Sequence, residues 1–359
     1  MKLLKYLIIL VVLPTGCFTG EELEPDQEIW EYAFPDDAGM SNDLLLEVNS
    51  GITAGSFQTV RSMIIIKDDK LIFENYYNGD TRGTIRPIGR SSPMVTVLAL
   101  GIAIEEGLIG GVNVLIRDVL PIQYDDIFAS NPLKRRITIE HLLLFESGLS
   151  WNEGVLNLND PANDVNAVKF SDDWVRFVLE KPLEAEPGIR FNFNSMSATV
   201  IAKIIEESAN MPFEEYVETK LFNKIGVVNY TWEEDPTGSI NAGTGLEINT
   251  LDLTKIGYLY LKEGLWQGER IVSEAWIESA VTLRKEVTNT INYGYGWHLF
   301  ADQLNFPKLS PNDTYFFPQH VFVSPSENLL VTLSGDNINL PTFGPPLLLY
   351  SEVITPLLQ

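Results

Sequence analysis

The chain has 359 residues, of which 45% are hydrophobic and 11% aromatic, and this composition excludes a mainly disordered protein. Its 49 acidic residues outnumber 25 basic ones and give a formal charge of −24, which disfavours binding to nucleic acids and to anionic lipid surfaces. We interpret this charge as a solvated surface rather than as a specific binding site.

The first residues have the pattern of an export signal. Two lysines precede a short apolar run at residues 6–13, which is too short to span a bilayer. The single cysteine, Cys17, follows a Thr-Gly pair as at a bacterial lipoprotein processing site, although Pro14 stands where such sites usually have leucine. We predict a lipoprotein-type signal peptide over residues 1–17 and a lipid anchor on Cys17, with ordinary cleavage as the alternative. The predicted location is the cell envelope, periplasmic or on the cell surface.

Residues 18–38 are rich in Glu, Asp and Pro and show little periodicity, so we predict an acidic tether there and one folded domain over residues 39–359. Within this domain, residues 62–77 contain two β-branched and aromatic runs around the sequence KDDK, a pattern that predicts a β-hairpin. Residues 319–337 have a second pattern of strand, turn and strand, and residues 347–358 predict a final helix packed on the sheet.

Residues 86–107, RPIGRSSPMVTVLALGIAIEEG, have apolar side chains at the spacing of a buried helix. Pro93 fits the first helical position, where a missing N–H costs nothing, and Ser91 or Ser92 can cap the free amides. The sequence therefore predicts a buried helix that begins near Pro93.

Together with this helix, four further segments resemble a known family, in the same order along the chain. They are ITIEHLLLFESGLSWNE (137–153), EPGIRFNFNSMSATVIAKIIEES (186–208), NAGTGLEINTLDLTKIGYLYLKEGLWQGERIVSEAWI (241–277) and YGYGW (293–297). They resemble the β-lactamase-related serine hydrolases, which include class C β-lactamases, D-alanyl-D-alanine peptidases of the penicillin-binding type and esterases. The resemblance implies a mixed α/β fold of β-lactamase/transpeptidase type, in which an antiparallel sheet built from both chain ends is flanked by helices and a mainly helical region is inserted.

The same resemblance implies a catalytic serine and lysine, spaced Ser-x-x-Lys, at the start of the 86–107 helix. Here Arg90 stands at the serine position and Pro93 at the lysine position. A shift of one or two residues brings Ser91 or Ser92 to the nucleophile position, but neither has a lysine three residues on. The nucleophile and its base are therefore predicted to be lost together.

The second family motif, Tyr-x-Asn, supplies a phenol for proton transfer and an amide that holds the substrate. Phe193 replaces the phenol and Ser195 replaces the amide, while Asn194 lies one position early and is a candidate pocket residue. A phenyl ring cannot transfer a proton, so this motif is also predicted to be lost.

The third family motif is a Lys or His followed by glycines on a strand beside the nucleophile, where the bare backbone donates an oxyanion N–H. Here residues 313–318, DTYFFP, contain no glycine. Tyr315 stands in the motif, and Phe316 and Phe317 are predicted to fill the pocket space that a substrate needs.

The sequence contains no motif that is typical of a metal or nucleotide site. The three histidines, His141, His298 and His320, lie far apart and lack the spacing of a zinc site. We interpret His141 as a structural residue and His298 as a surface residue near the pocket. No metal, nucleotide or other cofactor is expected.

We therefore expect a surface-anchored homologue that has lost catalysis and binds a peptide, glycan or protein in its former cleft. The alternative is an active esterase, amidase or β-lactamase-like hydrolase that uses Ser91 or Ser92 with an unconventional base, such as His298 or a nearby lysine. A third possibility is a scaffold that contributes only an interaction surface.

Overall fold

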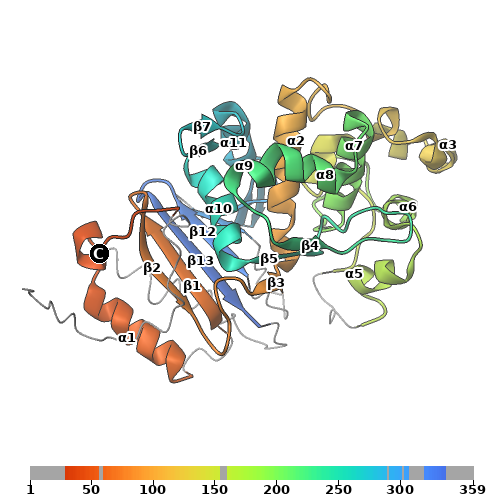
Figure 1. The fold of residues 1–359 in the computed structure, drawn as a ribbon. Helices are drawn as coiled ribbons and strands as arrows, with labels where there is room; N and C mark the ends of the chain where they lie inside the picture. Colours follow the sequence, from red (N-terminus) through yellow and green to blue (C-terminus); the bar gives the residue numbers. More distant parts are fainter. Residues whose placement is uncertain are drawn as a thin grey trace, which may run out of the picture.

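An antiparallel sheet of eight strands forms one side of the fold (Figure 1). The computed structural model describes residues 29–55, 60–153, 160–288, 291–300, 303–306 and 319–336. In spatial order the strands are β2 (Lys70–Tyr76), β1 (Val60–Lys67), β13 (Leu329–Gly335), β12 (His320–Ser324), β11 (Gln303–Phe306), β10 (His298–Phe300), β9 (Ile291–Tyr293) and β8 (Lys285–Thr288). Because β1 pairs with β13, an early segment and a late segment of the chain lie side by side in the sheet.

The hairpin predicted at residues 62–77 is confirmed as β1 and β2. Its two turn residues, Asp68 and Asp69, have φ angles of 52° and 63°, which is the left-handed geometry of the tight turns that match strand twist. The second hairpin is confirmed as β12 and β13. The predicted final helix lies outside the described residues.

Helices cover both faces of this sheet, and β1 shows the division because its side chains alternate between two apolar clusters. Ile64 and Ile66 belong to the large cluster, which includes α10 (Thr250–Leu261). Met63 and Ile65 belong to a smaller cluster with α1 (Asn42–Thr53). The fold class expected from the family resemblance is confirmed.

A mainly helical region is inserted between the two hairpins, as expected. Its helices are α2 (Pro93–Glu105), α3 (Asp125–Ser130), α4 (Ile139–Leu143), α5 (Asp164–Ala167), α6 (Trp174–Glu180), α7 (Ser197–Ala209), α8 (Phe213–Val217), α9 (Asn223–Ile225) and α11 (Glu274–Val281). Two small sheets accompany them, one of β3 (Ile85–Pro87), β5 (Leu246–Asn249) and β4 (Tyr230–Trp232), the other of β6 (Leu265–Trp266) and β7 (Glu269–Arg270). No helix in the described ranges is long and apolar enough to cross a membrane.

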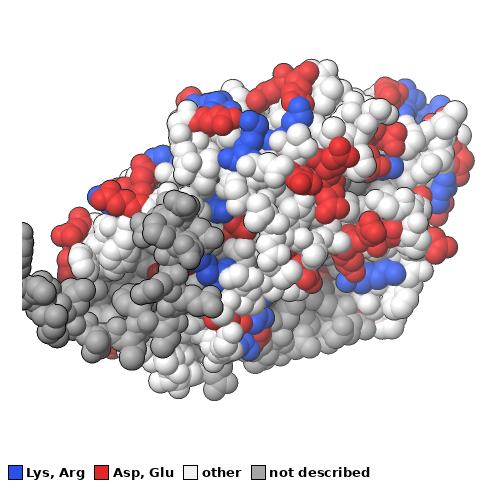
Figure 2. All heavy atoms as spheres, viewed as in Figure 1, with Lys and Arg blue, Asp and Glu red and all other residues white. Residues whose placement is uncertain are grey.

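Acidic side chains outnumber basic ones over the face that Figure 2 shows, including the surface above α8 and β4. Several of these carboxylates lie near one another. Partial burial, together with the neighbouring Glu234 and Glu218, raises the pKa of Glu214 above its usual range. Part of the negative formal charge of the chain thus lies on an exposed surface.

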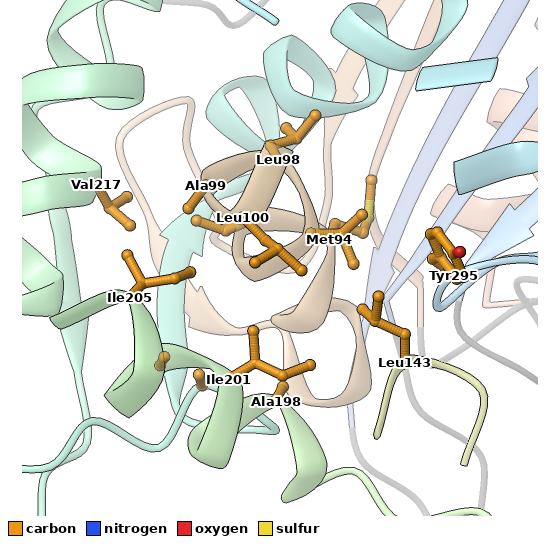
Figure 3. Packing of buried hydrophobic residues seen from close by; sticks show 14 of the residues in the cluster. Met94, Leu98, Ala99, Leu100, Leu143, Ala198, Ile201, Ile205, Val217 and Tyr295 are labelled. Carbon is orange, nitrogen blue, oxygen red and sulfur yellow. The ribbon is translucent and has the colours of Figure 1, made fainter. Parts of the chain in front are cut away.

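Helix α2 runs through the middle of the large cluster, and it is apolar on every side. Figure 3 shows Ala99 and Leu100 of α2 close to Ala198, Ile201 and Ile205 of α7. This packing fixes the starts of α2 and α7 relative to each other.

Trp276 of α11 packs on α2 from another side. Its indole N–H donates to the carbonyl of Val97 over 2.9 Å, and its ring lies where a Cβ on Gly101 would stand. Only glycine leaves room for this ring.

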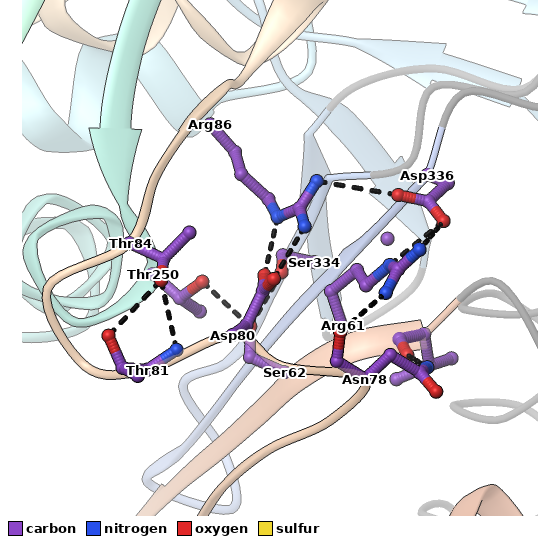
Figure 4. Close-up of polar contacts among 12 residues, drawn as sticks. Arg61, Ser62, Asn78, Asp80, Thr81, Thr84, Arg86, Thr250, Ser334 and Asp336 are labelled. Carbon is purple, nitrogen blue, oxygen red and sulfur yellow. Dashed lines mark hydrogen bonds and ion pairs between the residues drawn. The ribbon is translucent and has the colours of Figure 1, made fainter.

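Ion pairs and hydroxyl contacts connect the sheet to the segment that leads into α2 (Figure 4). Arg86 of β3 binds Asp80 and also reaches Asp336 at 3.4 Å, and Asp336 is held in turn by Arg61 of β1. Next to them, the hydroxyl of Ser62 lies 2.6 Å from Ser334 and 2.7 Å from Thr250. These contacts hold β3 beside β1 and β13.

Residues 29–38, which the sequence predicts as part of the tether, contact the domain, and the predicted boundary at residue 39 stays a prediction. Trp30 is 7% exposed and packs edge-on against Tyr258 and Trp266, with ring centroids 5.4 and 5.8 Å away. The backbone N–H of Ala33 donates to the carbonyl of Leu71. The acidic composition of this segment is typical of a tether, but Trp30 anchors the segment to the domain. Residues 1–28, including Cys17, lie outside the described residues.

Candidate functional site

The start of α2 is held by the small sheet of β3, β5 and β4. The backbone N–H of Ile88 continues the pairing beyond β3 by donating to the carbonyl of Leu246 over 2.9 Å. A short 3-10 turn, Gly89–Ser91, follows, and α2 begins at Pro93 as predicted. Arg90, Ser91 and Ser92 are therefore fixed between a sheet edge and a buried helix.

Ser92 does not cap the helix, so the predicted capping by this residue is corrected. Its backbone is already helical, with φ −54° and ψ −40°, whereas a capping side chain needs extended backbone. Instead, its hydroxyl donates to the carbonyl of Gly89 over 2.7 Å and accepts from the N–H of Leu246 over 3.2 Å. The Ser92 hydroxyl is thus used to join α2 to β5.

Ser91 is also completely buried. Its hydroxyl has no hydrogen-bond partner among the residues that the structure describes. Ser91 therefore neither caps the helix nor meets a base within the described part of the chain.

Arg90 turns into the protein at the start of α2 and is only 3% exposed. Its Nε donates to Oε1 of Glu153 over 2.8 Å, and its guanidinium carbon lies 4.8 Å from the centre of the Phe193 ring. A buried guanidinium needs an opposite charge, because the free-energy cost of removing an isolated ion from water is large. Glu153, 2% exposed, supplies that charge.

The second oxygen of the Glu153 carboxylate is bound just as closely. Oε2 accepts from the indole N–H of Trp151 over 2.7 Å, from the backbone N–H of Ser195 over 2.9 Å and from the Ser195 hydroxyl over 3.0 Å. With Arg90 Nε, four donors converge on one carboxylate. Charge-assisted hydrogen bonds of this kind are roughly twice as strong as neutral ones.

Neighbouring residues hold the backbone on which Glu153 lies. The backbone N–H of Asn152 donates to the Asp164 carboxylate, and the backbone N–H of Asp164 donates to the Asn152 carbonyl, each over 2.8 Å. The Asn163 amide donates to the Glu153 carbonyl over 3.3 Å, and Lys181 forms an ion pair with Asp164. The carboxylate of Glu153 is therefore positioned by contacts on both sides of residues 154–159.

Four aromatic rings lie beside this centre. Phe145 is central, with ring centroids 4.7 Å from Phe193, 5.9 Å from Phe191 and 5.5 Å from Tyr293. Phe145 has a φ of 56°, an unfavourable backbone conformation for a bulky residue that must be stabilised by its surroundings. Phe191 and Phe193 are only half-buried.

The structure thus brings Arg90, Phe193 and Ser195 together, as the family resemblance implies for the positions of the nucleophile, the phenol and the amide. Pro93 lies one turn from Arg90 in the buried start of α2. The side chain of Asn194 is buried, and neither amide atom has a hydrogen-bond partner in the described ranges.

Residues 313–318, with Tyr315, Phe316 and Phe317, lie outside the described residues, so the predicted filling of the pocket there stays a prediction.

The three histidines lie in different elements of the fold. Thr138 and His141 form a capping box at the start of α4, in which His141 Nδ1 accepts from the Thr138 N–H over 3.2 Å. Burial lowers the pKa of His141 below its usual value. This agrees with a structural role. His298 begins β10, but its side chain is not among those described. In the described ranges no three His, Cys, Asp or Glu residues could hold a metal ion.

Sequence reasoning did not single out Glu153 or Trp151, although both belong to the segment 137–153 that carries the resemblance. A usable signal was present in Arg90: an arginine at the start of an otherwise apolar, buried helix requires a buried carboxylate nearby. Local pattern could not identify which carboxylate, because Glu153 is 63 residues away in sequence.

In chemical terms the centre binds an anion. A guanidinium stays protonated at any pH that the protein tolerates, so Arg90 can donate hydrogen bonds but cannot accept the proton of a nucleophile. The Ser195 hydroxyl donates to a carboxylate that already accepts three other hydrogen bonds.

Comparisons with known proteins agree with this architecture. The family model described as Beta-lactamase matches residues 59–334. A 6-aminohexanoate-dimer hydrolase from Paenarthrobacter ureafaciens is 24% identical over an alignment of 237 residues. The match covers 61% of this chain and 56% of that protein, so the chain spans little more than half of the length of that relative.

Two solved structures show the same fold. A penicillin-binding protein homologue from Pyrococcus abyssi superposes with a TM-score of 0.64 at 19% identity, covering 87% of this chain and 77% of that one. A candidate 6-aminohexanoate-dimer hydrolase from Bacillus anthracis gives a TM-score of 0.71 at 16% identity, covering 92% and 87%.

Proposed function

Since the chain belongs to the beta-lactamase family, we propose that it is a member that has lost catalysis and acts as a binding protein through the region of the former active site. The observation that carries this proposal is the buried pair of Arg90 and Glu153. Arg90 stands where the family resemblance places the nucleophile, and its charge is neutralised inside the protein by the Glu153 carboxylate.

The remaining positions support the same proposal. Pro93 has no amine to accept a proton, Phe193 has no phenol, and Ser195 presents its hydroxyl to Glu153. In a serine hydrolase, removal of the nucleophile or its base alone costs on the order of a million-fold in turnover. Loss of both, together with the phenol, leaves no group among these positions that could start an acyl transfer.

Two of the three proteins named above are described as 6-aminohexanoate-dimer hydrolases, and this favours keeping an active enzyme as the second candidate function. It would use Ser91 or Ser92. Ser92 is poorly suited, because its hydroxyl already donates a hydrogen bond to the carbonyl of Gly89 and accepts one from the backbone N–H of Leu246. Ser91 is the better candidate, although it is fully buried.

A test of both candidates treats the purified protein with a fluorescent penicillin, a fluorophosphonate, nitrocefin and short-chain esters. We expect no covalent label and no turnover above that of Ser91→Ala and Ser92→Ala. Label on the wild-type protein that disappears in one of these two variants would establish the hydrolase and reject the proposal.

We further propose export to the cell envelope and a lipid anchor on Cys17, on the pattern of the first seventeen residues. The ligand of the binding site is proposed to be a peptide, a glycan or a protein rather than a nucleic acid. Labelled palmitate should enter the wild-type protein and not Cys17→Ala in the native host, and equal labelling of the two would contradict the anchor.

A further inference from the structure

The carboxylate of Glu153 is bound as proteins bind the carboxylate of a ligand. Its two oxygens meet a guanidinium, an indole N–H, a backbone N–H and a hydroxyl at 2.7–3.0 Å. The residues that supply these donors, Arg90, Trp151 and Ser195, are all more than nine-tenths buried. We call this set of three residues the carboxylate cradle.

We propose that the carboxylate cradle is a binding site for ligand carboxylates that the side chain of Glu153 occupies, and that the ligand of the former active site enters through a carboxylate which replaces that of Glu153. This inference rests on the proposed binding function and specifies its ligand class. The cradle donates hydrogen bonds to both oxygens of a carboxylate. A neutral amide has only one such oxygen, and its NH2 group cannot accept a hydrogen bond from the cradle.

The surroundings specify the rest of the ligand. The half-buried Phe193 lies directly against the Arg90 guanidinium, and Phe145 packs between Phe193 and the half-buried Phe191. An apolar or aromatic group next to the carboxylate would cover these rings. The formal charge of −24 and the acidic surface in Figure 2 disfavour polyanions. The ligand class is thus a molecule with one carboxylate and an adjacent apolar group, such as the carboxyl end of a peptide.

Glu153 competes with any such ligand because it belongs to the same chain. A tethered group acts at an effective concentration on the order of millimolar, so removal of its carboxylate should strengthen binding of an external carboxylate by about tenfold or more. The experiment therefore compares the wild-type protein with Glu153→Ala, using phenylacetate and acetate as probes and phenylacetamide and acetamide as neutral isosteres.

In Glu153→Ala we expect saturable binding of both carboxylates by calorimetry and a matching rise in melting temperature, with phenylacetate the tighter ligand. The amides and sodium chloride at equal ionic strength should have no such effect. The double variant Arg90→Met/Glu153→Ala should lose the response. Glu184→Ala, which removes the carboxylate of an exposed ion pair with Arg190, serves as the matched control and should show none.

The inference is overturned if folded Glu153→Ala responds equally to carboxylates and amides, or if Glu184→Ala responds as strongly. Should Glu153→Ala fail to fold alone, its refolding from urea in formate is compared with refolding in formamide. A higher folded yield in formate supports the cradle, and equal yields reject it.

This outcome is independent of catalysis. Covalent labelling of the wild-type protein would reject the proposed function while a carboxylate response in Glu153→Ala would still establish the cradle. Absence of both label and response would reject the cradle alone.

Discussion

The Nε of Arg90 donates to Oε1 of Glu153 over 2.8 Å, and both side chains are almost completely withdrawn from water. The pair joins the start of α2 to the segment before α5, through residues 63 positions apart in sequence. Because the charges compensate each other only while both are present, the pair links the stability of the domain to the identity of two buried residues, one at the start of α2 and one before α5.

Arg90→Met should reduce the free energy of unfolding by about 3–5 kcal/mol, since it leaves the Glu153 carboxylate buried without its opposite charge. Arg90→Met with Glu153→Gln should cost less than the sum of the single changes, by at least about 1 kcal/mol, as measured by urea unfolding. The exposed pair of Arg190 and Glu184 is the control and should show a coupling of only about 0.2–1 kcal/mol. Strict additivity at Arg90 and Glu153 would contradict their direct interaction.

Ser91 and Ser92 should respond differently to alanine. Ser92→Ala removes the partner of the Leu246 N–H and should cost about 1–3 kcal/mol in thermal or urea unfolding. Ser91→Ala removes a buried hydroxyl with no partner among the described residues, so its free energy of unfolding should be unchanged or slightly higher. A large loss of stability in Ser91→Ala would show that its hydroxyl has a structural partner.

Gly101→Ala should destabilise the protein even though helix propensity alone favours alanine by about 1 kcal/mol. The new Cβ would stand 2.2 Å from Cδ1 of Trp276, and overpacking of this kind costs about 1–3 kcal/mol. Trp276→Leu in the same chain should relieve part of the loss. Gly83→Ala, where a Cβ meets nothing within 4 Å, is the control and should be nearly neutral.

The pKa of His141 is lowered by burial from an ordinary value of 6.5, so the unfolded chain takes up a proton at a higher pH than the folded protein does. The contribution of a neutral His141 to stability is therefore full above about pH 6.5 and falls as the pH drops below it. His141→Asn should lose less stability than the wild type between neutral and mildly acidic pH, as measured by urea unfolding. An identical pH dependence in both proteins would exclude this assignment.

The elements with strong local patterns could be predicted from the sequence. The KDDK turn between two β-branched runs gave the β1–β2 hairpin, and the apolar spacing after Pro93 gave α2. Trp30 could not be placed, because its anchoring depends on Tyr258 and Trp266, more than 200 positions away along the chain. By composition alone, the acidic segment that contains Trp30 cannot be distinguished from a tether.

The candidate site was predictable only in part for the same reason. The resemblance placed Arg90, Phe193 and Ser195 at one centre, but the residue that connects them, Glu153, has no local pattern of its own. The expected capping by Ser92 failed because the 3-10 turn before α2 gives that residue helical dihedrals, and a turn of this kind has no distinct sequence signature here.

The pairing of β1 with β13 has a consequence for synthesis of the protein. Arg61 and Asp336, which flank this pairing, are 275 positions apart, so a nascent chain on the ribosome cannot complete the central sheet until translation has passed β13. Closure of so long a loop is entropically slow to nucleate. Until then the edge of β1 that pairs with β13 lacks its partner, and the backbone N–H and C=O groups along that edge are unpaired.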